Sequence, residues 1–521
     1  MLRQGKTALF ELIDKLDKNE KRYLTLHLGN SVSGYNIYYK LFRAVSDKNI
    51  KDNKTVLETL PEIKAAQLPN LKTYLYHQIL KLLKQYQSNK DIESEMHDML
   101  EFIRTLYNKG LTAQCRVILK NAIALCEKHE LYLYRSLLSE WEMRLQISRI
   151  EQQRKQLDIE TETEKARNIF RQKKEAMKNY SAIAAMELLQ QEVFIHIRED
   201  RFSRKPLQIQ KIESLIEEKA LLSKKPASFK SFKTGFLYHN SLAIYHITAG
   251  HYQQSYTHFR AVLDLFERFP FARKNDPGQW SAALYNFILN CMRIYRFDEH
   301  YYKAMQQYES LLSGKSSPAA LYCLQLVYYS TRGEFSAGLP MAKNIESKIR
   351  KGISHDSVFI KLDLYFDLMY IYFGSGNYEA ALTWLNKILI DKAANKVTDL
   401  YSVCLLIQLV LHYELKNTLI LDSLLRSAQR FLKQKSRKYR FEAIFLSHMA
   451  QLANVEDEKA RRQCLKSLHK AIKKLEQDPY ESRIFEYLDF PLWVKSKIKK
   501  DSFEQLAQKQ YSKLSRQKIA D

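Results

Sequence analysis

The sequence predicts an all-α protein, a right-handed α-solenoid of helical hairpins preceded by an N-terminal helical domain. Helix-breaking residues are scarce, since the 521 residues include only 13 glycines and 10 prolines. The stretch from Leu111 to Lys205 contains neither residue type, so long helices can run through it. From about residue 226 onward, one pattern of glycine, aromatic and small residues recurs, which is typical of stacked repeats.

Residues 1–90 are predicted to form a basic helical domain. Apolar residues recur at helical spacing in three places, and Gly29, Gly34 and Pro69 separate these places. Residues 91–225 are predicted to form long helices. Charged residues alternate in sign from Arg149 to Lys178, which indicates exposed helices with ion pairs between successive turns.

Residues 226–480 are predicted to form the repeats. The best copies share a glycine, an aromatic residue two positions later and a small residue three positions after that. They are Gly250-x-Tyr252, Gly333-x-Phe335 and Gly376-x-Tyr378. Weaker copies surround Phe297 and Thr418, and an early copy at 96–130 is centred on Gly110. We expect the glycine to end the first helix in a left-handed conformation, and the small residue, such as Ala381, to allow close helix packing.

This pattern resembles the tetratricopeptide repeat family. The resemblance implies an array of helical hairpins with a concave side built by the first helix of each hairpin, and a role in protein binding. The copies here lie 38 to 45 residues apart, whereas the family unit has about 34 residues. A nonrepetitive bundle of helical hairpins is the alternative interpretation of the same residues.

The N-terminal domain resembles that of uncharacterised bacterial helical-repeat proteins. Three segments carry this resemblance, Lys18–Tyr23, Tyr38–Arg43 and Leu71–Leu80. The resemblance implies no activity. Residues 481–521 are predicted to form a basic C-terminal helical tail.

The net charge of +25 is uneven along the chain, and the densest cationic run is Arg430–Arg440. Five residues of this run are candidates for an anion or nucleic-acid patch, Lys433, Lys435, Arg437, Lys438 and Arg440. A solvated helix end would explain the same run, because cations also suit helix C-termini.

Sequence motifs for catalysis are absent, so we expect no enzymatic activity, no cofactor and no metal. The chain contains neither a G-x-x-x-x-G-K-[ST] phosphate loop nor an H-E-x-x-H zinc motif. His239 and His246 lie seven residues apart, on one helix face, and occupy packing positions of the repeat. No Cys, Asp or Glu joins them at ligand spacing, so a packing role is the favoured interpretation.

The favoured function is a scaffold or adaptor that binds another protein or a peptide on the concave side of the solenoid. Six residues of first helices are candidates for this groove, Asn240, Ile244, Cys323, Val327, Phe366 and Tyr370. For Phe366 and Tyr370, burial against a neighbouring helix is an equal alternative. A nucleic-acid-associated regulator that contacts phosphates through the basic termini is the second hypothesis.

Cysteine usage and hydropathy indicate a cytoplasmic protein. The six cysteines are scattered without a C-x-x-C pair, which favours a reducing compartment. The longest apolar run, Val403–Leu411, is about half the length of a membrane span, and no signal peptide is expected. The sequence leaves the oligomeric state open.

Overall fold

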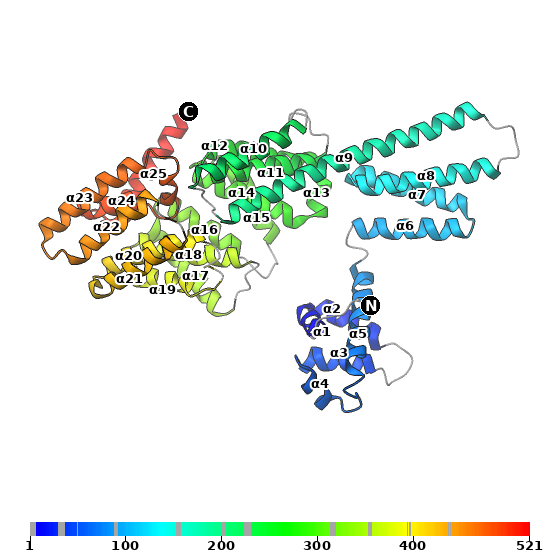
Figure 1. Ribbon diagram of the computed structural model, residues 1–521, viewed down its shortest axis with the longest axis horizontal. Coiled ribbons are helices and arrows are strands. Elements are labelled where there is room, and N and C mark those ends of the chain that lie inside the picture. Colours follow the sequence, from blue (N-terminus) through cyan, green and yellow to red (C-terminus); the bar gives the residue numbers. More distant parts are fainter. Residues whose placement is uncertain are drawn as a thin grey trace. The chain divides into compact units, whose positions relative to one another are not determined.

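The computed structural model describes residues 7–29, 37–48, 50–87, 92–152, 158–199, 204–222, 231–312, 319–352, 357–392, 394, 398–435, 437 and 439–520. Within these ranges the regular elements are helices and no strand occurs, which confirms the predicted all-α class (Figure 1). None of these helices is both long enough and apolar enough to cross a membrane.

The chain divides into two compact units, Met1–Ala176 and Met177–Asp521, and the boundary lies inside helix α9. The division into four parts expected from the sequence stays a prediction. Each unit is described by itself below.

Unit 1 begins with five helices that share one hydrophobic core. They are α1 (Ala8–Lys15), α2 (Lys18–Gly29), α3 (Ile37–Lys48), α4 (Asn53–Thr59) and α5 (Leu68–Gln87). Leu9, Leu41 and Leu75, one from each predicted apolar face, are buried together in this core. Asp52 begins α4 by accepting a hydrogen bond from the Thr55 backbone N–H at 2.9 Å, which satisfies a free helix-end donor.

The rest of unit 1 consists of longer helices around a second core. They are α6 (Ile92–Asn108), α7 (Thr112–His129), α8 (Tyr132–Gln152) and the first half of α9 (Ile159–Glu199). Polar pairs join α8 to α9, in addition to pairs between successive turns of α9 such as Lys165 with Glu162. The Lys173 ammonium lies 3.0 Å from the Glu140 carboxylate, and Arg149 pairs with Glu162.

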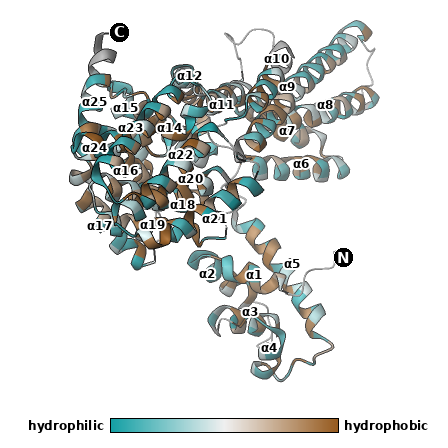
Figure 2. Ribbon diagram, turned by 60° about the vertical axis from the view of Figure 1, so that its left-hand side comes forward, coloured by the Kyte–Doolittle hydropathy of each residue, from teal (hydrophilic) through white to brown (hydrophobic). Residues whose placement is uncertain are grey.

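Unit 2 is a succession of helical hairpins, each packed against the next. Its helices after α9 are α10 (Pro206–Leu222), α11 (Phe232–Ala249), α12 (Tyr252–Arg268), α13 (Pro270–Asn275), α14 (Pro277–Arg293), α15 (Glu299–Leu312), α16 (Ala319–Arg332), α17 (Phe335–Arg350), α18 (Val358–Gly374), α19 (Tyr378–Leu389), α20 (Thr398–Glu414), α21 (Thr418–Gln434), α22 (Arg440–Asn454), α23 (Glu458–Leu475), the 3-10 helix η3 (Glu481–Glu486), α24 (Phe490–Lys499) and α25 (Phe503–Ala520). Apolar residues dominate α18 and α20, which are buried among their neighbours (Figure 2). The organisation is therefore repeat-like.

Five hairpins of unit 2, from α11–α12 to α20–α21, share one turn geometry. Gly250, Gly333 and Gly376 have φ angles of 87°, 68° and 81°, which is the left-handed conformation expected from the sequence. In the weaker copies, Tyr295 and Lys416 take the same position with φ angles of 55° and 59°. The left-handed residue is thus common to the turns, whether or not glycine supplies it.

Each of these turns closes with the same backbone hydrogen bond. The residue after the left-handed position donates its N–H to the carbonyl five residues earlier, the bond of a Schellman motif. In the α18–α19 turn, Asn377 donates to Tyr372 at 2.9 Å, and in the α16–α17 turn, Glu334 donates to Tyr329 at 2.9 Å. This bond satisfies a carbonyl at the end of the first helix and fixes the direction in which the second helix leaves.

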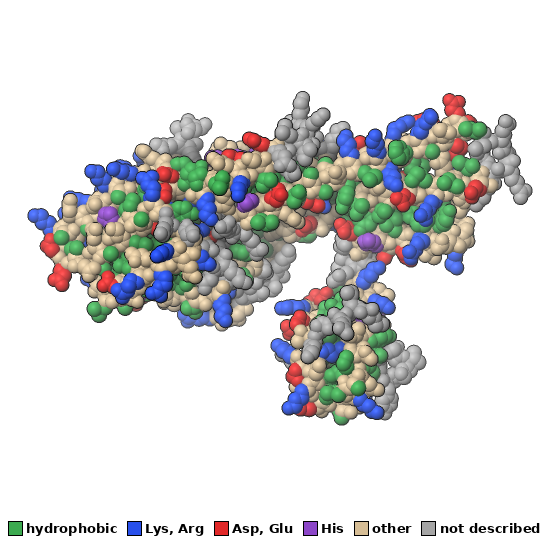
Figure 3. Space-filling view, viewed as in Figure 1, with side chains coloured by type: hydrophobic (Ala, Val, Ile, Leu, Met, Phe, Trp, Pro, Cys, Tyr) green, Lys and Arg blue, Asp and Glu red, His purple; other side chains and the backbone are tan. Residues whose placement is uncertain are grey.

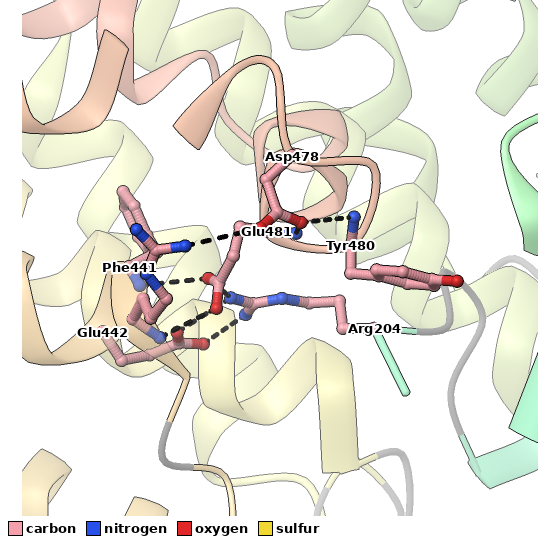
Figure 4. A network of polar contacts seen from close by, with 7 residues as sticks. Arg204, Phe441, Glu442, Asp478, Tyr480 and Glu481 are labelled. Carbon is pink, nitrogen blue, oxygen red and sulfur yellow. Dashed lines mark hydrogen bonds and ion pairs between the residues drawn. The ribbon is translucent and has the colours of Figure 1, made fainter. Parts of the chain in front are cut away.

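A buried ion triad links three distant segments of unit 2 (Figure 4). Arg204, just ahead of α10, places one guanidinium nitrogen 3.0 Å from Glu442 and 2.6 Å from Glu481. Glu481 also accepts hydrogen bonds from the backbone N–H groups of Arg440 and Phe441, at 2.9 and 3.1 Å. The triad therefore holds η3 against the first turn of α22. Burial raises the pKa of the Glu442 carboxyl, and Arg204 opposes this rise.

Gly374 and Gly376 provide a matched test of the turn. A Cβ at Gly374 would lie 2.2 Å from the buried ring of Phe335, whereas a Cβ at Gly376 would meet nothing within 4 Å. We expect Gly376→Ala to lower the free energy of unfolding by about 1 kcal/mol through backbone strain alone. Gly374→Ala should cost roughly 2–3 kcal/mol through overpacking. Urea titrations followed by circular dichroism measure both, and equal costs would contradict the packing described.

Replacing Arg204 tests the ion triad. Arg204→Met leaves two carboxylates buried without their cation, so we expect a loss of about 3–5 kcal/mol in the free energy of unfolding. Arg440→Met is the control, because the Arg440 side chain is exposed and lies 3.6 Å from Asp478. It should cost less than about 1 kcal/mol. Similar urea midpoints for the two variants would show that the triad does not hold η3.

Candidate functional site

The inner helices of unit 2 border a hollow of about 630 Å³. Its walls come from α14, α16, α18 and the start of α20 on one side, and from η3, α24 and α25 on the other. Helices α14, α16 and α18 are first helices of consecutive hairpins, and α14 packs on α16 as α16 packs on α18. The hollow thus lies on the side that the repeat pattern predicted to be concave.

Three of the six predicted groove residues, Val327, Phe366 and Tyr370, line this hollow. They come from two consecutive hairpins, and the structure brings them together.

The other three predicted groove residues lie elsewhere. Asn240 and Cys323 are buried, and Ile244 is half-buried. None of the three lines the hollow.

Phe366 and Tyr370 meet the C-terminal segment as well as the hollow. The ring centroid of Phe366 lies 5.9 Å from that of Tyr487, and Tyr370 lies 6.4 Å from Phe503. The two alternatives predicted for this pair were a place on the groove and burial against a neighbouring helix, and each describes part of its surroundings. One part of the pair is covered by neighbouring residues of the chain, and the rest borders the hollow.

Contacts with the turn between α16 and α17 hold helix α25 in place beside the hollow. Glu504 accepts a hydrogen bond from the Ser336 backbone N–H at 2.7 Å, at the first turn of α17. A Cβ at Gly333 would lie 2.6 Å from the Gln508 backbone nitrogen, so glycine there permits the close approach of α25. The segment expected as a tail is thus part of the wall, with Phe490 and Trp493 buried in the main core.

Carboxylates give one end of the hollow a negative character. Asp363 and Asp367 lie near Tyr285 on the lining of the hollow, which also includes Arg293. Burial, then the neighbouring Cys323, Asp363 and Asp367, raise the pKa of Tyr285 well above its ordinary value. Burial also raises the pKa of Asp489. An ionised tyrosine is disfavoured here, and a cation would be stabilised.

The C-terminal side of the hollow adds further aromatic and acidic groups. Burial, aided by Asp489 and Glu486, raises the pKa of Tyr295 to about 12. The Asp489 carboxylate is oriented by the Leu492 N–H at 2.8 Å and by the Gln510 amide at 3.1 Å. Sequence reasoning missed these wall residues because it treated 481–521 as a tail. The apolar run from Phe490 to Val494 was the available signal.

The predicted anion patch is only partly a surface. Lys433, Lys435 and Arg440 are exposed, whereas Arg437 is buried. Lys438 lies outside the described residues. The exposed cationic surface of this run is therefore smaller than its sequence suggested, and its role stays a prediction.

The histidines singled out from the sequence belong to a cluster between α11 and α12. The Nδ1 atoms of His239 and His258 lie 2.9 Å apart, and the rings of His246 and His258 stack with centroids 5.4 Å apart. Burial first, and then neighbouring histidines, lower the pKa of His239 and of His246 to about 4. The described residues contain no group of three or more His, Cys, Asp or Glu side chains that could hold a metal ion.

No family model matches the chain, and no curated protein matches it either.

The histidine cluster makes stability depend on pH. The folded-state pKa of about 4 for His239 and His246 lies below the ordinary value of 6.5, so the unfolded chain takes up these protons first as pH falls. We expect the melting temperature to fall between pH 6.5 and pH 4. His246→Phe keeps a flat ring but cannot titrate, and should reduce that fall. An identical fall in the variant would rule out this cause.

Proposed function

We propose that this protein is a scaffold or adaptor without catalytic chemistry, and that it binds a segment of another protein in the inner hollow of unit 2. In this proposal the hairpins form a right-handed array of the tetratricopeptide kind. The observation that carries the proposal is the hollow itself, lined by Val327, Phe366 and Tyr370 from consecutive hairpins. Helical-repeat arrays commonly present their binding surface on this side.

The size and lining of the hollow fit a short peptide segment. A volume of about 630 Å³ lies within the range of roughly 300–1,000 Å³ found for ligand pockets. Aromatic rings supply rigid apolar contact area, which binding hot spots favour. Asp363 and Asp367 supply negative charge, so a segment that combines a basic residue with apolar neighbours fits best.

A Trp placed in the hollow tests the proposal. Ser330 lies on α16 and borders the hollow, so Ser330→Trp should fill the space with little change to the core. Asn344→Trp, at an exposed position of α17, is the matched control. Peptides selected from a random library by the native chain should bind Ser330→Trp at least tenfold more weakly, as measured by fluorescence anisotropy.

The controls make the outcome decisive. Both variants should keep the circular dichroism spectrum of the native chain, and Asn344→Trp should bind the selected peptides normally. Selected peptides that bind Ser330→Trp with undiminished affinity would place the binding surface outside the hollow. Failure to select any peptide would contradict the proposal for short segments altogether.

A further inference from the structure

Helix α23 carries a line of cations along its outer face. Lys459, Arg462, Lys466, Lys470 and Lys473 are all exposed, and they follow one another at intervals of three or four residues. This spacing places them on one side of the helix over about 21 Å. The opposite side is buried and consists of Leu465, Leu468, Ile472 and Leu475, with Cys464. We call the five cations the α23 stripe.

The α23 stripe does not serve the stability of the helix. Like charges three or four residues apart repel one another on a helix surface. Lys459 and Arg462 also lie near the positive N-terminal end of the helix dipole, where cations are unfavourable. Among the described residues, no ion pair joins any of the five to an acidic side chain. An anion bound along this face would offset the repulsion.

The neighbouring helix α24 enlarges the cationic surface. The Arg462 guanidinium donates a hydrogen bond to the Ile498 carbonyl at 3.5 Å, which brings the exposed Lys499 and Lys500 beside the stripe. Burial, followed by Lys473 and Lys495, lowers the pKa of His469, as expected in a positive field. Several Lys and Arg side chains, interspersed with Asp and Glu side chains, lie over the end of unit 2 that holds α23 and α24 (Figure 3).

We propose that the α23 stripe binds the phosphate backbone of double-stranded nucleic acid. A duplex presents one negative charge per roughly 1.7 Å of its axis, so about twelve phosphates surround a 21 Å length of it, and those on the facing side lie within reach of the stripe. This surface is separate from the inner hollow and from the run Arg430–Arg440. It gives the protein a second binding activity beyond that of a scaffold.

The chemistry of the outer face selects the duplex over other anions. Beside the stripe, the exposed side chains of α23 include Glu458, Gln463, Ser467 and Lys474, and none is aromatic or a large aliphatic one. Single strands are usually held by base stacking on aromatic rings, and membranes by inserted apolar residues. A protein partner would need apolar anchors as well. Lysine is a point charge without the bidentate geometry that reads bases, so binding is expected to be independent of base sequence.

The test compares two variants with equal charge. In the stripe variant, Lys459, Arg462, Lys466, Lys470 and Lys473 are all changed to Gln. The control variant changes five scattered exposed lysines to Gln, at Lys109, Lys128, Lys274, Lys351 and Lys392. Binding of the full-length chain to a 20-base-pair DNA duplex and to an RNA duplex is measured by fluorescence anisotropy over a salt series.

We expect the stripe variant to bind duplexes at least tenfold more weakly than the control variant. The slope of log affinity against log salt should become shallower by about 0.9 for each DNA phosphate that the stripe variant no longer neutralises. Its melting temperature should equal or exceed that of the native chain, because the repulsion is removed. Equal duplex affinities for the two variants would overturn the proposal.

Three further probes separate other anionic ligands. They are a single-stranded oligonucleotide, polyglutamate and vesicles with phosphatidylserine. The native chain should prefer the duplex to each of them at matched salt. If polyglutamate or vesicles bind more tightly than the duplex, and lose this binding in the stripe variant, the stripe serves an acidic protein or a membrane and the proposal fails.

Discussion

The left-handed residue at the end of the first helix, repeated in five hairpins from α11 to α21, is the constraint on which unit 2 depends. A single residue with positive φ, closed by one hydrogen bond to the carbonyl five residues earlier, reverses the chain and starts the second helix. Because consecutive hairpins repeat this geometry, first helices such as α14, α16 and α18 become neighbours. Their shared side then forms one wall of the hollow. The candidate binding surface is therefore a consequence of turn chemistry.

The other wall depends on contacts between distant parts of the chain. The Arg204 triad holds η3 against α22, and Glu504 joins the start of α25 to the start of α17. Without these contacts the inner aromatic residues would face solvent along the array. With them, the C-terminal segment covers part of the inner face and leaves an acidic, aromatic hollow within a strongly cationic protein.

Local sequence patterns predicted the local part of this structure. Glycine followed by an aromatic residue located the turns at Gly250, Gly333 and Gly376, because few other residues adopt positive φ cheaply. Tyr295 shows the limit of such reasoning, since nothing in its residue type announces a left-handed turn. The pairing of Arg204 with η3 joins residues more than 270 positions apart, and tertiary packing alone decides it. For the same reason only three of the six predicted groove residues line the hollow.

Hydrogen–deuterium exchange with a bound peptide tests most directly whether the hollow is the binding surface. Backbone amides exchange more slowly where a ligand stabilises the helices that it contacts. The account predicts that a bound segment slows exchange in α16, α18 and α25 together, although α25 lies far from the other two helices in the sequence. Slower exchange confined to the second helices α17, α19 and α21, or to unit 1, would contradict it.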